Sequence, residues 1–267
     1  MKVTLPSNGL LGTRWVDMRE PTYADLRKTV SATTDEYLFK YEFVKGLAEF
    51  DDTKITMDDV QYLYDVAASA ISFNTLNFKV ECSECGEKIE GEFSFMEDEV
   101  PVHTLHKNSR KCSKKIDEVE YDFHILSAAD GVDIHTYALD DSESDKMIEE
   151  ATVCKVLGYK ITEENIEKIR NLPVSIYVAC FLFIKANRHG MIIAKQITCP
   201  KCGAVTNMRI EMDSSWVKMD LPMFIAQYAE VRDCLDFQSF LKFTIPELKN
   251  FVGYLNAEAK KNQNEWE

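Results

Sequence analysis

The feature that most constrains this chain is a Cys-x-x-Cys-Gly sequence that occurs twice, at residues 82–86 and 199–203. Each copy lies between two runs of residues that are typical of β-strands. Two cysteines separated by two residues place both sulfurs on one side of a tight turn, and the glycine lets the backbone reverse. A structural tetrahedral zinc site needs four ligands, so each cysteine pair must find two more.

The first pair can complete a zinc site from residues that follow it. Cys82, Cys85, His106 and Cys112 have the spacing Cys-x2-Cys-x20-His-x5-Cys, which suits a zinc finger with a long loop. His103 is an alternative ligand in the same stretch. This local set is the first choice that the spacing indicates.

The second pair has no such local solution. No histidine follows Cys202, and the only later cysteine, Cys234, lies in a helical pattern. We call each Cys-x-x-Cys-Gly turn a knuckle. Either the second knuckle is a turn without metal, or the two knuckles share one ion through Cys82, Cys85, Cys199 and Cys202. A chain that binds no metal is the third alternative. A catalytic zinc is disfavoured because it needs an open coordination position beside an acid or base.

Composition restricts the partners that the chain can have. Among 267 residues, 45 acidic and 31 basic side chains give a net charge of −14, which disfavours binding to nucleic acid.

The N-terminal segment is interrupted by Pro6 and Gly9, so no signal peptide is expected. The eight cysteines are therefore expected to be reduced thiols or metal ligands. The most apolar run, 172–184, is too short to span a membrane and predicts a buried helix. No catalytic motif is present, so neither an enzyme nor a small-molecule substrate is expected.

The order of local signals predicts an α+β fold of helical segments with small β-hairpins and zinc knuckles. Capping boxes at Thr33-x-x-Glu36, Thr56-x-x-Asp59 and Thr244-x-x-Glu247 predict the starts of three helices. Two strand-like runs around Ala129-Asp130-Gly131 predict a further β-hairpin. We therefore expect three regions. These are residues 1–115 with helices and the first knuckle, 116–150 with the hairpin and an acidic connector, and 151–267 with helices, the second knuckle and a C-terminal helix.

The two halves also look alike, which suggests an internal duplication. Lys-Ile-Thr at residues 54–56 and again at 160–162 precedes an acidic helical turn, an apolar helix, an extended run and a knuckle. The longer spacing in the second copy predicts a helix that is about three turns longer. Chance resemblance is the alternative, because Lys-Ile-Thr is short.

Residues 3–93 resemble a family of baseplate hub and hub-assembly proteins from T-even-type contractile-tailed bacteriophages. "VTLPSNGLL" is similar to the family's opening motif, and "VDMREPTYADL" is similar to its strand followed by an acidic helix start. The segment "DDTKITMDDVQYLYDVAASAISFNTLNFKVECSECGEKIEGEF" is similar to its helix, aromatic strand and Cys-x-x-Cys region. The chain departs from the family at residues 57–59 and 72–74, and the resemblance does not extend to the second half.

This resemblance implies a non-enzymatic virion protein of the tail baseplate, made in the host cytoplasm, that acts through contacts with other tail proteins. The knuckles would then be zinc-stabilised staples. The resemblance also implies that the N-terminal segment with Leu5, Pro6, Ser7 and Gly9 is ordered, pairs with a sheet edge of the same chain or of a neighbour, and binds a partner. The alternatives are a zinc-ribbon regulator that binds nucleic acid through a basic surface, such as 107–115, and a metalloenzyme with an active-site cleft.

Overall fold

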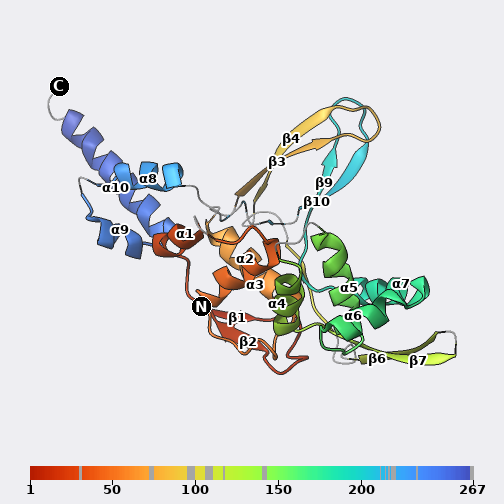
Figure 1. Cartoon of the computed structure of the whole chain (residues 1–267). Helices are drawn as coiled ribbons and strands as arrows, with labels where there is room; N and C mark the ends of the chain where they lie inside the picture. The colour runs from red at the N-terminus through yellow and green to blue at the C-terminus, as the bar shows by residue number, and fades with distance from the viewer. Residues whose placement is uncertain are drawn as a thin grey trace. The chain divides into compact units, whose positions relative to one another are not determined.

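The computed structural model describes most of the chain as helices and two-stranded sheets (Figure 1). The described residues are 1–29, 32–71, 75–94, 100–105, 111–116, 118–139, 143–210, 212–213, 215, 217, 221–232 and 234–264. Their helices are α1 (Tyr23–Thr29), α2 (Glu36–Lys45), α3 (Met57–Ile71), α4 (Ala128–Tyr137), α5 (Ser144–Val156), α6 (Glu163–Arg170), α7 (Val174–Ala186), α8 (Leu221–Ala229), α9 (Phe237–Lys242) and α10 (Ile245–Asn264).

The strands within the described residues form five antiparallel pairs. They are β1 (Lys2–Thr4) with β2 (Trp15–Asp17), β3 (Thr75–Glu81) with β4 (Lys88–Ser94), β5 (Val102–His103) with β8 (Gly190–Met191), β6 (Lys111–Ile116) with β7 (Val119–His124), and β9 (Ile193–Thr198) with β10 (Val205–Ile210). Helices and small antiparallel sheets alternate along the chain, so the α+β class is confirmed.

The chain packs into two compact units, and each is drawn from three separate stretches. The first consists of residues 1–18, 33–65 and 100–193, and the second of residues 19–32, 66–99 and 194–267. The three consecutive regions expected from the sequence, 1–115, 116–150 and 151–267, cut across these units. Residues distant in sequence therefore meet within each unit.

In the first unit the N-terminal segment is ordered and pinned to the start of α3. Strand β1, directly before Leu5, pairs with β2 of the same chain. Leu5 and Ser7 are buried, and the backbone N–H of Ser7 donates to Asp59 Oδ1 over 3.1 Å. Asn8 and Gly9 both have positive φ, which reverses the chain directly after this contact.

The start of α3 is a reciprocal cap, as its sequence predicts. The Asp59 N–H donates to Thr56 Oγ1 and the Thr56 N–H donates to Asp59 Oδ2, both over 3.0 Å. The side chain of His189 is buried and joins this junction, with its Nε2 2.7 Å from Thr56 Oγ1, and the His189 backbone N–H donates to Asp58. Asp59 is itself fully buried, so one carboxylate holds a helix start and the N-terminal segment together.

Two local predictions in this unit were wrong. Residues 119–139 are not a β-hairpin, because β7 pairs with β6 and the chain then enters α4. Ser127 and Asp130 form a capping box, so Ala-Asp-Gly is the first turn of a helix.

The second wrong prediction is the capping box at Thr33. The cap of α2 is Asp35, two residues after Thr33, and its carboxylate accepts from the Leu38 N–H. Much of the segment expected as an acidic connector is also helical, because α5 begins at Ser144.

The second copy of the repeated pattern contains two helices where one long helix was expected. Thr162 caps α6, since its side chain accepts from the Asn165 N–H, just as Thr56 caps α3. Pro173 then precedes α7, which is bent from α6 by 107°. One face of α7 is buried, but Val174, Val178 and Leu182 are exposed, so the expected burial holds for one face only. No single helix in the described residues is long and apolar enough to cross a membrane; only α6 and α7 taken together reach that length.

In the second unit, aromatic side chains pack α1, α8 and α9 together. Tyr23 contacts Phe240 with ring centroids 4.6 Å apart, and Phe224, Tyr228 and Phe237 pack around them. The predicted cap of α10 is present, because the Thr244 N–H donates to Glu247 and the Glu247 N–H to Thr244 Oγ1.

The double role of Asp59 leads to a stability prediction. Replacing Asp59 by alanine leaves the N–H groups of Ser7 and Thr56 without their acceptor in a buried site, and should cost about 2–4 kcal/mol of unfolding free energy. Asp130→Ala is the matched control, because Asp130 caps α4 in the same way but is 30% exposed, and its contact with another helix is a partly exposed ion pair with Lys155. It should cost about 1 kcal/mol. Urea unfolding followed by circular dichroism measures both. Equal losses would contradict the proposed contact with the N-terminal segment.

Candidate metal centre

Each Cys-x-x-Cys-Gly sequence forms the turn of a β-hairpin in the second unit. Strands β3 and β4 flank the first turn, and β9 and β10 flank the second (Figure 1). In the first turn the Cys82 N–H donates to Glu87 O and the Gly86 N–H to Cys82 O, both over 2.9 Å. Gly86 has φ +70°, a conformation that side chains other than glycine rarely adopt.

The second turn repeats this geometry residue by residue. The Cys199 N–H donates to Ala204 O over 2.8 Å, the Gly203 N–H donates to Cys199 O over 2.9 Å, and Gly203 has φ +74°. The shared Cys-x-x-Cys-Gly sequence therefore produces the same knuckle twice. Each knuckle presents two sulfurs at the end of its hairpin.

The two knuckles face each other and bring four sulfurs together. The Sγ atoms of Cys82, Cys85, Cys199 and Cys202 all lie within 4.8 Å of one another. Cys82 Sγ is 3.6 Å from Cys202 Sγ, and Cys85 Sγ is 3.6 Å from Cys199 Sγ. A tetrahedral zinc ion with Zn–S bonds of about 2.3 Å places its sulfurs roughly 3.8 Å apart. The cluster therefore fits a metal ion such as zinc, with all four ligands supplied by the chain.

A small apolar core and complementary charges support this contact between the hairpins. Ile89 and Ile197 are buried together with Cys82 and Cys199, and Cys85 is packed against them. Residues 75–94 contain five glutamates and two lysines, whereas residues 193–210 contain three basic residues and no acidic one. Lys201 Nζ lies 3.2 Å from a carboxylate oxygen of Glu87, and Lys195 Nζ donates to the carbonyl of Glu92 over 2.8 Å.

Hydrogen bonds and desolvation shift the pKa values of Cys85, Cys199 and Cys202. The backbone N–H of Cys202 stabilises the thiolate of Cys199 and lowers its pKa to about 7. The backbone N–H of Glu87 acts in the same direction on Cys85, but desolvation and hydrogen bonds with the other three sulfurs together raise the pKa of Cys85 to about 12. The pKa of Cys202 is raised as well. Four thiolates at this spacing repel one another, so a divalent cation is the group that would let all four ionise.

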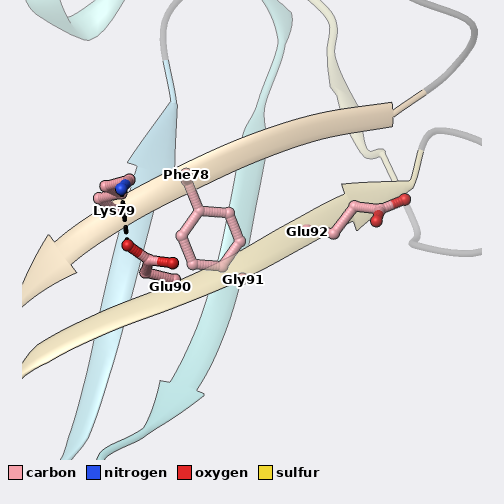
Figure 2. A pocket seen from close by; sticks show the side chains of 5 residues that line it. All are labelled: Phe78, Lys79, Glu90, Gly91 and Glu92. Atoms are coloured by element: carbon pink, nitrogen blue, oxygen red, sulfur yellow. Dashed lines mark ion pairs between the residues drawn. The ribbon is translucent and has the colours of Figure 1, made fainter.

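The first hairpin also has a tightly packed face away from its turn. Figure 2 shows the Phe78 ring across Gly91, where an added Cβ would lie 2.4 Å from the ring. Any larger residue at position 91 would displace this ring. The surface hollow here is also lined by Glu92 and by the ion pair of Lys79 with Glu90, whose Nζ and Oε1 are 2.6 Å apart (Figure 2). These groups stiffen the hairpin and form no catalytic arrangement.

The structure brings together the shared set of candidate ligands, Cys82, Cys85, Cys199 and Cys202, and the local set that was ranked first stays a prediction. His106 lies outside the described residues. Cys112 is exposed on β6, and His103 is exposed on β5, where its Nδ1 lies 3.0 Å from the Arg188 carbonyl; both belong to the first unit. Spacing favoured near neighbours in sequence, whereas the ligands come from two hairpins more than a hundred residues apart.

The segment expected to bind a partner is mostly buried within the chain. Leu5, Pro6 and Ser7 are buried, and Gly9 is half-buried. The Pro6 carbonyl accepts from the Leu105 N–H over 2.9 Å. These contacts account for the order of the segment, and a role in binding a partner stays a prediction.

The chain is thus an α+β protein in which two hairpins, each ending in a knuckle, meet at a four-cysteine site. It matches no protein-family model, no curated protein and no solved structure.

The four-cysteine geometry predicts how metal content responds to substitution. The full chain should bind one zinc ion, and Cys199→Ser should lose it, because three remaining sulfurs no longer fill a tetrahedral site. Cys112→Ser is the matched control and should keep a full equivalent. Inductively coupled plasma mass spectrometry of the purified variants measures zinc per chain. Loss of zinc from Cys112→Ser with retention in Cys199→Ser would instead establish the local set.

Proposed function

We propose that this protein is a non-enzymatic structural or assembly component of a contractile phage tail baseplate hub, acting through protein–protein contacts. The observation that carries the non-enzymatic part is the four-cysteine cluster. A tetrahedral ion held by four sulfurs has no open position for water or substrate, which is typical of a structural site and not of a catalytic one. Zinc is the cofactor we propose, as a staple between hairpins.

The phage assignment is supported by the motifs that carry the family resemblance. Ser7 of the Leu-Pro-Ser motif contacts Asp59, and Arg19 makes two hydrogen bonds to the carboxylate of Asp25 over 2.6 and 2.7 Å. Cys82 of the Cys-x-x-Cys motif lies in the metal centre. The motifs therefore coincide with residues on which the fold depends, as expected when a family shares a structure.

The partners we propose are other tail proteins, with no membrane and no small-molecule substrate involved. Three apolar side chains are exposed on α7, at Val174, Val178 and Leu182. Contacts between proteins commonly bury such side chains. The net charge of −14 would favour partner surfaces with basic residues. The site of action we propose is the virion, after synthesis in the host cytoplasm.

A zinc-ribbon regulator of nucleic acid is the second candidate, and the described surfaces favour it less. On β6, Lys115 lies opposite Glu120 of β7, and Lys114 lies opposite Tyr121. Around the knuckles, Lys79 and Lys201 each contact a glutamate. Phosphate would have to compete with these carboxylates, which lowers its affinity.

The proposal is tested in the phage that encodes the chain, with an amber codon introduced at an early position. Without suppression, infected cells should accumulate tail parts that lack complete baseplates in electron micrographs, because the hub cannot form. A suppressor strain that inserts the natural residue is the control and should restore infectious particles.

Quantitative mass spectrometry of purified particles separates the two forms of the proposal. A fixed copy number per particle identifies a structural component. Absence from particles that nevertheless require the gene identifies an assembly factor. Normal baseplates in the unsuppressed infection would refute the proposal.

A further inference from the structure

The four cysteines differ in accessibility in an ordered way. Cys202 is exposed and Cys85 is partly exposed, whereas Cys82 and Cys199 are buried. Each contact of 3.6 Å between the hairpins joins one accessible sulfur to one buried sulfur, Cys202 to Cys82 and Cys85 to Cys199. A reagent from solvent therefore reaches one member of each pair first, and the other member lies next to it.

This arrangement suits two-step oxidation of a thiol pair. We propose that the metal centre is also an oxidation site for peroxides, at which Cys202 and Cys85 are attacked first and Cys82 and Cys199 resolve them into two disulfides that join the hairpins. The sulfurs of each pair must approach from 3.6 Å to about 2.05 Å. The inference rests on the geometry of the cysteines and does not require the proposed function.

The chemistry balances without any further reagent. The accessible thiolate attacks one peroxide oxygen, which breaks the O–O bond, forms a sulfenic acid and releases hydroxide. The buried thiolate then attacks the sulfenic sulfur, forms the S–S bond and releases a second hydroxide. Each pair loses two electrons to one hydrogen peroxide, so two peroxides convert four thiolates into two disulfides. The zinc ion then has no thiolate ligand and leaves as Zn²⁺.

Which cysteines form disulfides determines whether the two hairpins stay covalently linked after oxidation. Disulfides Cys82–Cys202 and Cys85–Cys199 keep the hairpins tied after the metal has left. Disulfides within each knuckle, Cys82–Cys85 and Cys199–Cys202, would leave the hairpins without a covalent link. If the proposed function holds, a protein made in reducing cytoplasm and carried outside the cell would keep its staple in both environments.

The test uses the full zinc-loaded chain with Cys112→Ser and Cys234→Ser, which removes two exposed thiols outside the cluster. Hydrogen peroxide is added in steps while a zinc-binding dye reports released metal, and free thiols are then alkylated. Glu84 lies between Cys82 and Cys85, and Lys201 lies between Cys199 and Cys202. Glutamyl endopeptidase together with trypsin therefore separates all four cysteines for mass spectrometry without reduction.

We expect one zinc released per two peroxides and peptides linked as Cys82–Cys202 and Cys85–Cys199. Dimedone added during the reaction should label Cys202 and Cys85 as sulfenic acids. The chain with all its cysteines is the control and should give the same two linkages. Disulfides within the knuckles, dimedone on Cys82 or Cys199, or zinc retention under excess peroxide would each overturn the inference.

Discussion

The contact of four sulfurs at the ends of two hairpins is the interaction on which the second unit depends most. It joins Cys82 to Cys202, which are 120 positions apart in sequence. Among the described side chains, the apolar core beneath it buries Ile89, Ile197 and two of the cysteines, with Phe78, Val80 and Ala204 packed against them. By analogy with a disulfide, closing a loop of this length corresponds to roughly 4–5 kcal/mol of chain entropy. A structural zinc ion supplies enough binding free energy to offset this cost, at about 10–16 kcal/mol in small zinc-finger peptides.

The first unit relies on a different device, a buried polar junction. The carboxylate of Asp59 accepts from the N-terminal segment and from the cap of α3, and His189 reaches the same cap from the turn after α7. Because the Asp59 carboxylate accepts on both oxygens, displacing either segment leaves a buried N–H donor unsatisfied. Both units therefore join distant stretches of chain through a few directional contacts, in addition to apolar packing.

Local chemistry was predictable from the sequence, and partnerships over long distances were only partly so. The caps at Thr56 and Thr244 and the two knuckles followed from motifs of four or five residues, since their geometry is determined within that span. The hairpin expected at residues 119–139 was wrong because Ala-Asp-Gly is compatible with a turn or a helical start, and the Ser127–Asp130 cap decided for the helix. For the metal site, the local set ranked first stays a prediction because His106 lies outside the described residues, whereas the four clustered sulfurs come from both knuckles. Ligand spacing identifies cysteines and histidines that are close in sequence. The signal that pointed to a shared ion was the presence of the same Cys-x-x-Cys-Gly sequence in both knuckles.

The central claim is that one ion is held by sulfur alone, and X-ray absorption at the zinc edge tests it most directly. We predict four sulfur scatterers at about 2.3 Å and no nitrogen, as for a site made only of cysteines. A site completed by His106 would instead show three sulfurs and a nitrogen at about 2.0–2.1 Å. That spectrum from the full-length chain would contradict the account, and a spectrum of four sulfurs would support it.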